Sequence, residues 1–170
     1  MKDIIVGIGE ILWDILPTGK VLGGAPANFA YHISQLGFDG FVVSAIGDDE
    51  LGEEIIENLR NKNMNFIIER VPFPTGTVQV ALNEVGVPCY EICENVAWDN
   101  IPFTEEMKQL AKGTKAVCFG SLAQRHFVSR ESIHLFLDNV AEGTLKIFDI
   151  NLRQHFYSKD LIDYSLKRCN

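Results

Sequence analysis

Hydrophobic residues along this chain form short continuous runs that alternate with stretches of helical periodicity. The runs at 4–6, 41–46, 115–119 and 145–150 predict buried strands, because unbroken β-branched and aromatic segments suit strands covered on both faces. Apolar residues recur at helical spacing over 26–36, 50–62, 104–111, 129–140 and 159–168. This alternation of strands and helices predicts an open α/β sheet with mainly parallel strands.

Residues at the helix boundaries support these assignments. Pro26 suits the first turn of the helix over 26–36, and Gly37 suits its C-terminal end. Asp48 or Asp49 would cap the helix over 50–62. We therefore expect the first helix to begin just after Gly23-Gly24.

A different pattern interrupts the alternation at 66–98. Residues 77–82 and 88–93 alternate with period two on either side of 83–86, which predicts an inserted β-hairpin. A hairpin with one apolar face needs a cover, so we expect it to fold over a cleft, to pair with another subunit, or to do both.

Composition narrows the possible partners. The 170 residues carry a formal net charge of -8, which disfavours nucleic acid and anionic membranes as partners. Four cysteines without a C-x-x-C pair favour a reduced, cytoplasmic compartment and no metal site. The apolar run near the N-terminus, 4–8, is too short for a signal peptide or a membrane span.

Two common nucleotide-binding motifs fail on inspection. Gly7-x-Gly9 follows a predicted strand, but the third glycine of the dinucleotide fingerprint is replaced by Leu12. Gly19-Lys20 lacks the Ser or Thr of a P-loop, since Val21 follows. Any nucleotide must therefore be bound by another arrangement.

The segment from Gly23 to Asn28 is the most informative chemically. Two glycines allow a ligand to approach the backbone closely, and the helix that follows aims free N–H groups and the Asn28 amide at that ligand. A polyhydroxylated molecule would suit this edge. The alternative is a plain turn in which Asn28 serves as a cap.

Wider spacing adds a family resemblance. Gly23-Gly24, Pro26, Asn28, Ala30, Gly37 and Gly47 resemble the first signature of the ribokinase-like (PfkB) carbohydrate kinases. Residues 9–17 look like that family's opening strand and loop, especially in its fructokinase branch, and residues 91–101 are also similar. The resemblance implies a ribokinase-like three-layer α/β core with a mainly parallel sheet. It also implies a small β-sheet lid built from about 12–22 and 66–98.

The resemblance also implies an activity. It points to ATP- and Mg-dependent phosphorylation of a small sugar, most of all fructose, and Ala25 in place of the lysine of ribokinases argues against ribose and toward fructose or another hexose. Other substrates, namely 2-keto-3-deoxygluconate, ribose or a nucleoside, stay open. A non-catalytic sugar-binding or regulatory subunit is the competing hypothesis, and a homodimer through the lid is compatible with both.

Family motifs assign roles to individual residues. Asp14 would bind sugar hydroxyls, or else cap the turn at 17–19, and Gly23, Gly24 and Asn28 would complete the pocket on its other side. In the stretch Asp149-x-Asn151-x-Arg153, Arg153 would bind substrate or the transferred phosphate, or else hold its own loop through a salt bridge. Further candidates for lid or pocket contacts are Gln79, Tyr90, Trp98, Ser121 and Asn151.

Phosphoryl transfer also needs a base and an anion hole for the γ-phosphate. No Gly-Ala-Gly-Asp stretch, the family's combination of the two, occurs in this sequence. We therefore expect residues 1–170 to be the N-terminal, sugar-binding part of a longer kinase. The base and the nucleotide-binding part would lie beyond Asn170, and these residues alone would be inactive.

Overall fold

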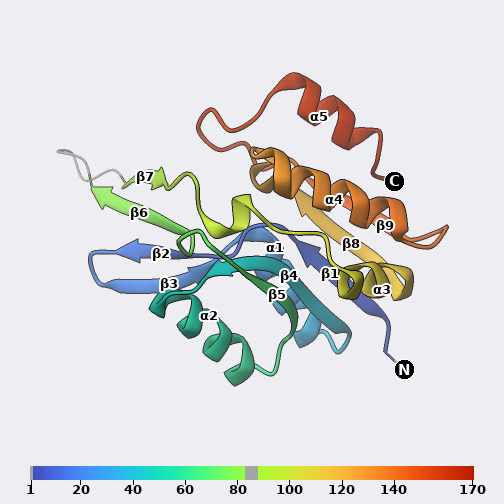
Figure 1. Cartoon of the computed structure of the whole chain (residues 1–170), viewed down its shortest axis with the longest axis horizontal. Helices are drawn as coiled ribbons and strands as arrows, with labels where there is room; N and C mark the ends of the chain where they lie inside the picture. Colours follow the sequence, from blue (N-terminus) through green and yellow to red (C-terminus); the bar gives the residue numbers. More distant parts are fainter. Residues whose placement is uncertain (1, 83–87) are drawn as a thin grey trace.

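The computed structural model describes residues 2–82 and 88–170 and contains a five-stranded sheet at its centre (Figure 1). The strand order is β5-β4-β1-β8-β9, and every neighbouring pair is parallel. The strands are β1 (Ile4–Ile8), β4 (Asp39–Gly47), β5 (Asn65–Val71), β8 (Thr114–Gly120) and β9 (Leu145–Asp149). The predicted α/β sheet is confirmed.

Both faces of this sheet are covered. Val42 and Ile46 of β4 pack on one face with helices α1 (Ala25–Gln35) and α2 (Glu50–Asn61). Val43 and Ala45 point to the other face and pack with α3 (Glu105–Gly113) and α4 (Phe127–Asn139). This alternation follows from the strand's period of two and produces three layers.

Helix starts follow the capping residues. Asp49, rather than Asp48, caps α2 by accepting the N–H of Gly52 at 2.8 Å. Thr104 and Ser158 cap α3 and α5 (Lys159–Leu166) in the same way. None of the helices in the described part of the chain is both long and apolar enough to cross a bilayer.

A second, four-stranded sheet lies beyond the carboxyl end of β1 (Figure 1). Its order is β3-β2-β6-β7, with strands β2 (Leu12–Leu16), β3 (Gly19–Gly23), β6 (Thr77–Leu82) and β7 (Pro88–Ile92). The predicted small sheet is therefore present, and β6 and β7 pair antiparallel as a hairpin would. The turn expected at 83–86 lies outside the described residues.

One boundary differs from the sequence-based expectation. The insertion does not begin at residue 66, because β5 is an edge strand of the main sheet, paired parallel with β4 from Asn65 to Val71. Ile67 faces one core cluster while Phe66 and Ile68 face the other. An edge strand that alternates between two helix layers looks like a hairpin strand in sequence, which explains the error.

Candidate functional site

The carboxyl ends of β1, β8 and β9 meet the start of α1 and the second sheet. A Cβ on Gly9, just after β1, would lie 2.9 Å from Cγ of Pro26 and 3.1 Å from Cβ of Ala123. Gly120 and Asp149 are register partners at the ends of β8 and β9. Ligands of open α/β sheets bind at this edge, so it is the candidate site.

Asp14 and Gly23 lie side by side. They occupy the paired strands β2 and β3, and a Cβ on Gly23 would stand only 2.6 Å from Oδ2 of Asp14. Asp14 is half-buried, and burial raises the pKa of its carboxyl above the ordinary value. The structure thus brings the predicted hydroxyl-binding carboxylate against the double glycine.

Gly24 fixes how α1 begins. It is the N-cap, with φ 110, and a Cβ there would lie 2.3 Å from the carbonyl oxygen of Glu10. Asn28 stands one turn into the helix, where its N–H donates to the Gly24 carbonyl at 2.9 Å and its side chain is exposed. Asn28 is therefore not the cap, and its amide is open to solvent.

Glu10 is a residue that the sequence analysis missed. It lies two residues after β1, next to Gly9, and its residue surface is only 2% exposed. Burial raises the pKa of its carboxyl to about 7. Backbone hydrogen bonds from Glu10 and Ala25 and the charge of Arg125 lower that pKa, whereas Asp149 raises it. A charged residue in the glycine turn after a buried strand was the available signal.

Polar groups at the ends of β8 and β9 form hydrogen bonds with each other. Ser121 is buried, its N–H donates to the Asp149 carbonyl at 3.2 Å, and its hydroxyl donates to the Asn151 carbonyl at 3.0 Å. Arg153 is exposed two residues further on. The structure therefore gives Ser121 a role in joining the two strand ends and leaves the Arg153 side chain in solvent.

The remaining candidates divide between the second sheet and the core. Gln79 is exposed on β6 opposite Glu91 of β7. Tyr90 lies in β7, but its side chain is outside the part that the structure describes. Trp98 is fully buried in the larger core cluster and packs under Arg125, 4.0 Å from the guanidinium carbon to the ring centre.

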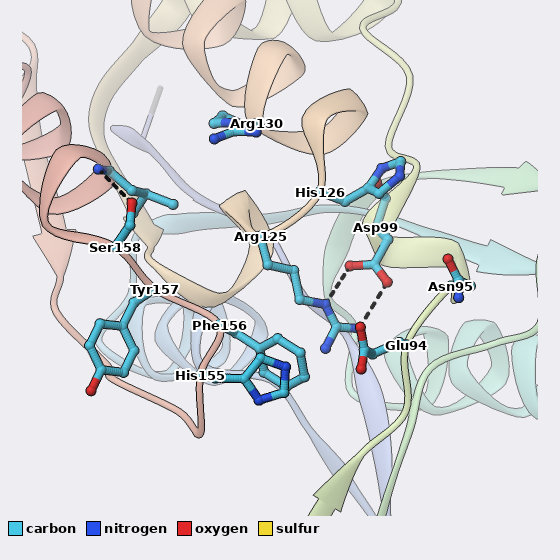
Figure 2. A pocket seen from close by; sticks show the side chains of 11 residues that line it. Glu94, Asn95, Asp99, Arg125, His126, Arg130, His155, Phe156, Tyr157 and Ser158 are labelled. Carbon is cyan, nitrogen blue, oxygen red and sulfur yellow. Dashed lines mark hydrogen bonds and ion pairs between the residues drawn. The ribbon is translucent and has the colours of Figure 1, made fainter.

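Next to this edge lies a cavity of about 330 Å³ (Figure 2). His155, Phe156 and Tyr157 from the loop after β9 line it together with Asp99 and Arg125, whose guanidinium lies over the Phe156 ring. None of the predicted substrate-binding residues lines it. Within the part of the chain described by the structure, no group of three or more His, Cys, Asp or Glu side chains could hold a metal ion.

Comparison with known proteins identifies the class. The family described as pfkB family carbohydrate kinase matches residues 17–164. The chain belongs to this family, and its fold is the ribokinase-like α/β fold.

Two relatives illustrate the sequence similarity. A Pyrococcus horikoshii protein described as a sugar kinase is 31% identical over 163 residues, covering 88% of this chain and 52% of the relative. An Arabidopsis thaliana protein described as a fructokinase is also 31% identical, over 171 residues, covering 89% of this chain and 52% of the relative. The chain thus spans about half the length of these relatives.

Solved structures agree on the fold. The Pyrococcus horikoshii sugar kinase in complex with ATP superposes with a TM-score of 0.80 at 28% identity, over 97% of this chain and 58% of that one. Vibrio cholerae fructokinase has a TM-score of 0.84 at 23% identity, over 99% and 62% of the two chains. The second similarity concerns the fold alone.

Proposed function

We propose that the full-length protein containing this chain transfers the γ-phosphate of ATP to a hydroxyl of a small sugar. The observation that carries this proposal is the Asp14 carboxylate lying against Gly23 at the start of α1. A carboxylate accepts hydrogen bonds from two sugar hydroxyls at once. An apolar ligand of the same shape would leave the carboxylate without partners, so the site selects for the sugar. The backbone at Gly24 and the Asn28 amide complete the acceptor side, while Arg153 binds substrate or phosphate from the β9 loop.

Fructose is the proposed acceptor. The Arabidopsis thaliana relative supports it, as does Ala25, which places no lysine beside the double glycine.

The second sheet acts as a lid that excludes water, because a γ-phosphoryl group must reach a sugar hydroxyl and not a water molecule. Through the same sheet, two copies of the protein form a dimer.

ATP is the proposed phosphoryl donor, supported by the ATP complex of the Pyrococcus horikoshii sugar kinase. Mg²⁺ accompanies it, since phosphoryl transfer requires a metal to neutralise charge on the β- and γ-phosphates. The base, the anion hole and the metal belong, in this proposal, to parts of the full-length protein outside the described residues.

A substrate panel tests the proposal. Full-length protein is incubated with Mg-ATP and fructose, ribose, 2-keto-3-deoxygluconate or a nucleoside, and ADP release is followed. We expect ADP release to depend on a sugar and to be fastest with fructose. Sugar binding without ADP release would favour the regulatory-subunit hypothesis. Faster ADP release with another acceptor would mean that this acceptor, and not fructose, is the substrate.

A further inference from the structure

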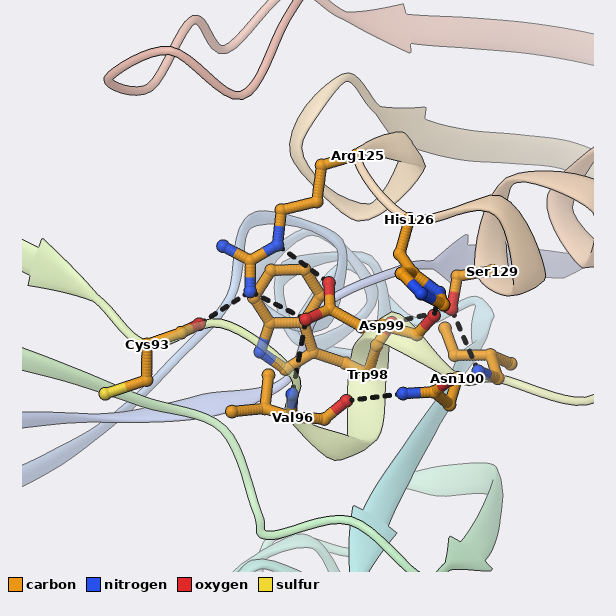
Figure 3. A network of polar contacts seen from close by, with 9 residues as sticks. Cys93, Val96, Trp98, Asp99, Asn100, Arg125, His126 and Ser129 are labelled. Carbon is orange, nitrogen blue, oxygen red and sulfur yellow. Dashed lines mark hydrogen bonds and ion pairs between the residues drawn. The ribbon is translucent and has the colours of Figure 1, made fainter.

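Arg125 is a buried cation directly after the short 3₁₀ helix η2 (Leu122–Gln124). Its side chain is 6% exposed, and that of its partner Asp99 is 3% exposed. Nε donates to Oδ1 of Asp99 at 2.7 Å and Nη2 donates to Oδ2 at 2.8 Å, a two-point ion pair (Figure 3). Nη2 also donates to the carbonyl of Cys93 at 2.6 Å.

Two aromatic rings enclose the same guanidinium. Its carbon lies 4.0 Å from the ring centre of Trp98 and 4.4 Å from that of Phe156, which belongs to the loop after β9. Nη1 is buried without a hydrogen-bond partner among the described residues. Replacing a buried ion pair with apolar residues often stabilises a protein, so stability alone does not account for this arrangement.

The groups that Arg125 contacts lie at the base of the β6–β7 hairpin, where the chain enters β6 and leaves β7. Cys93 follows β7 immediately, and its N–H donates to the carbonyl of Thr77, the first residue of β6, at 3.1 Å. Trp98 touches the residue before β6, because a Cβ on Gly76 would lie 2.2 Å from its Nε1. Arg125 therefore donates to the Cys93 carbonyl on one side of the base and packs on the Trp98 ring on the other.

We propose that Arg125 is a positioning residue that fixes the base of the β6–β7 hairpin against the loop after β9. The inference deepens the proposed function, on which its kinetic consequences rest. Arg125 contacts no substrate. It sets where the β6–β7 hairpin stands relative to Asp14 on β2, because Gly76, just before β6, accepts the N–H of Trp13 on β2 at 3.0 Å.

The test compares hydrogen exchange and kinetics in the full-length protein. Arg125→Met removes the fork, and Arg125→Lys keeps the charge without the two-point geometry. Since Arg125→Met leaves Asp99 buried and unpaired, Arg125→Met with Asp99→Asn provides a variant without that charge. Arg168→Met is the matched control, because Arg168 also pairs with a carboxylate, Asp138, and lies over a ring, that of Tyr164.

We expect amides of β6 and β7 to exchange about tenfold faster in Arg125→Met and in the double variant, and unchanged in the control. In Arg125→Met, kcat/KM for the sugar falls by about 100-fold, while KM for ATP stays within about twofold of wild type. In Arg125→Lys, kcat/KM for the sugar is about tenfold higher than in Arg125→Met.

Unchanged exchange in β6 and β7, with only a lower melting temperature, would overturn the proposal. Equal losses in Arg125→Met and Arg168→Met would do the same. If the wild type phosphorylates no sugar in the panel, the proposed function fails, but the exchange comparison still decides whether Arg125 positions the hairpin.

Discussion

Replacing Glu10 with Gln removes a buried titrating group and leaves its shape. Glu10 is 2% exposed at the end of β1, and its carboxyl interacts with Ala25 of α1, Asp149 of β9 and Arg125 after β8. The amide of Gln cannot ionise. We therefore expect the pH dependence of stability to differ between wild type and Glu10→Gln, and the structure predicts its sign and size.

Folding raises the pKa of Glu10 from 4.5 to about 7, chiefly through burial. The folded state thus binds this proton more tightly than the unfolded state. The stability that the proton confers is fully present below pH 4.5 and is lost as the pH rises through about 7. At about 1.4 kcal/mol per pH unit, wild type loses about 2.5 kcal/mol relative to Glu10→Gln between about pH 5 and about pH 8.

Urea unfolding of both full-length proteins at these two pH values measures the difference. Asp48→Asn is the control, because Asp48 is an exposed carboxylate at the end of β4. The free energy of unfolding of Glu10→Gln should increase relative to that of wild type as the pH rises. A stability difference that is the same at both pH values, or one that moves the other way, would refute the burial argument.

Further predictions concern the backbone at the site and the junction with α2. Gly24→Ala should cost about 3 kcal/mol or more in thermal unfolding, because its Cβ would meet the Glu10 carbonyl at a positive φ. Gly37→Ala, also at positive φ but in open space, should cost only about 1 kcal/mol, and equal costs would contradict the close approach. Asp49→Ala should cost about 2 kcal/mol in urea unfolding, since Asp49 caps α2 and accepts two hydrogen bonds from Thr75; a loss below about 0.5 kcal/mol would show that these bonds are dispensable.

The strands and helices of the core were predictable because each carries its own periodicity. The run at 41–46 became β4 (Asp39–Gly47), with neighbouring residues serving opposite core clusters. Residues 66–71 were grouped with the hairpin that follows them, because local sequence does not say which sheet a strand joins. That choice depends on the parallel pairing with β4, a contact between distant segments.

The candidate site was predictable only where family motifs mark it. Asp14 and Gly23 were expected together, and the antiparallel pairing of β2 and β3 places them together. Glu10 and Arg125 escaped notice because their burial arises from tertiary packing. Gly24 approaches the carbonyl of the buried Glu10, and Arg125 is covered by Trp98 of a 3₁₀ helix (Ala97–Asp99) and by Phe156 of the loop after β9.

The most direct test of the central claim is the KM for fructose of full-length Asp14→Asn. Loss of hydrogen bonds to a charged acceptor should raise this KM by about 10- to 100-fold, while KM for ATP stays within about twofold of wild type. Asp48→Asn should behave as wild type. If Asp14→Asn leaves both KM and kcat for fructose unchanged, Asp14 does not hold the sugar and the site lies elsewhere.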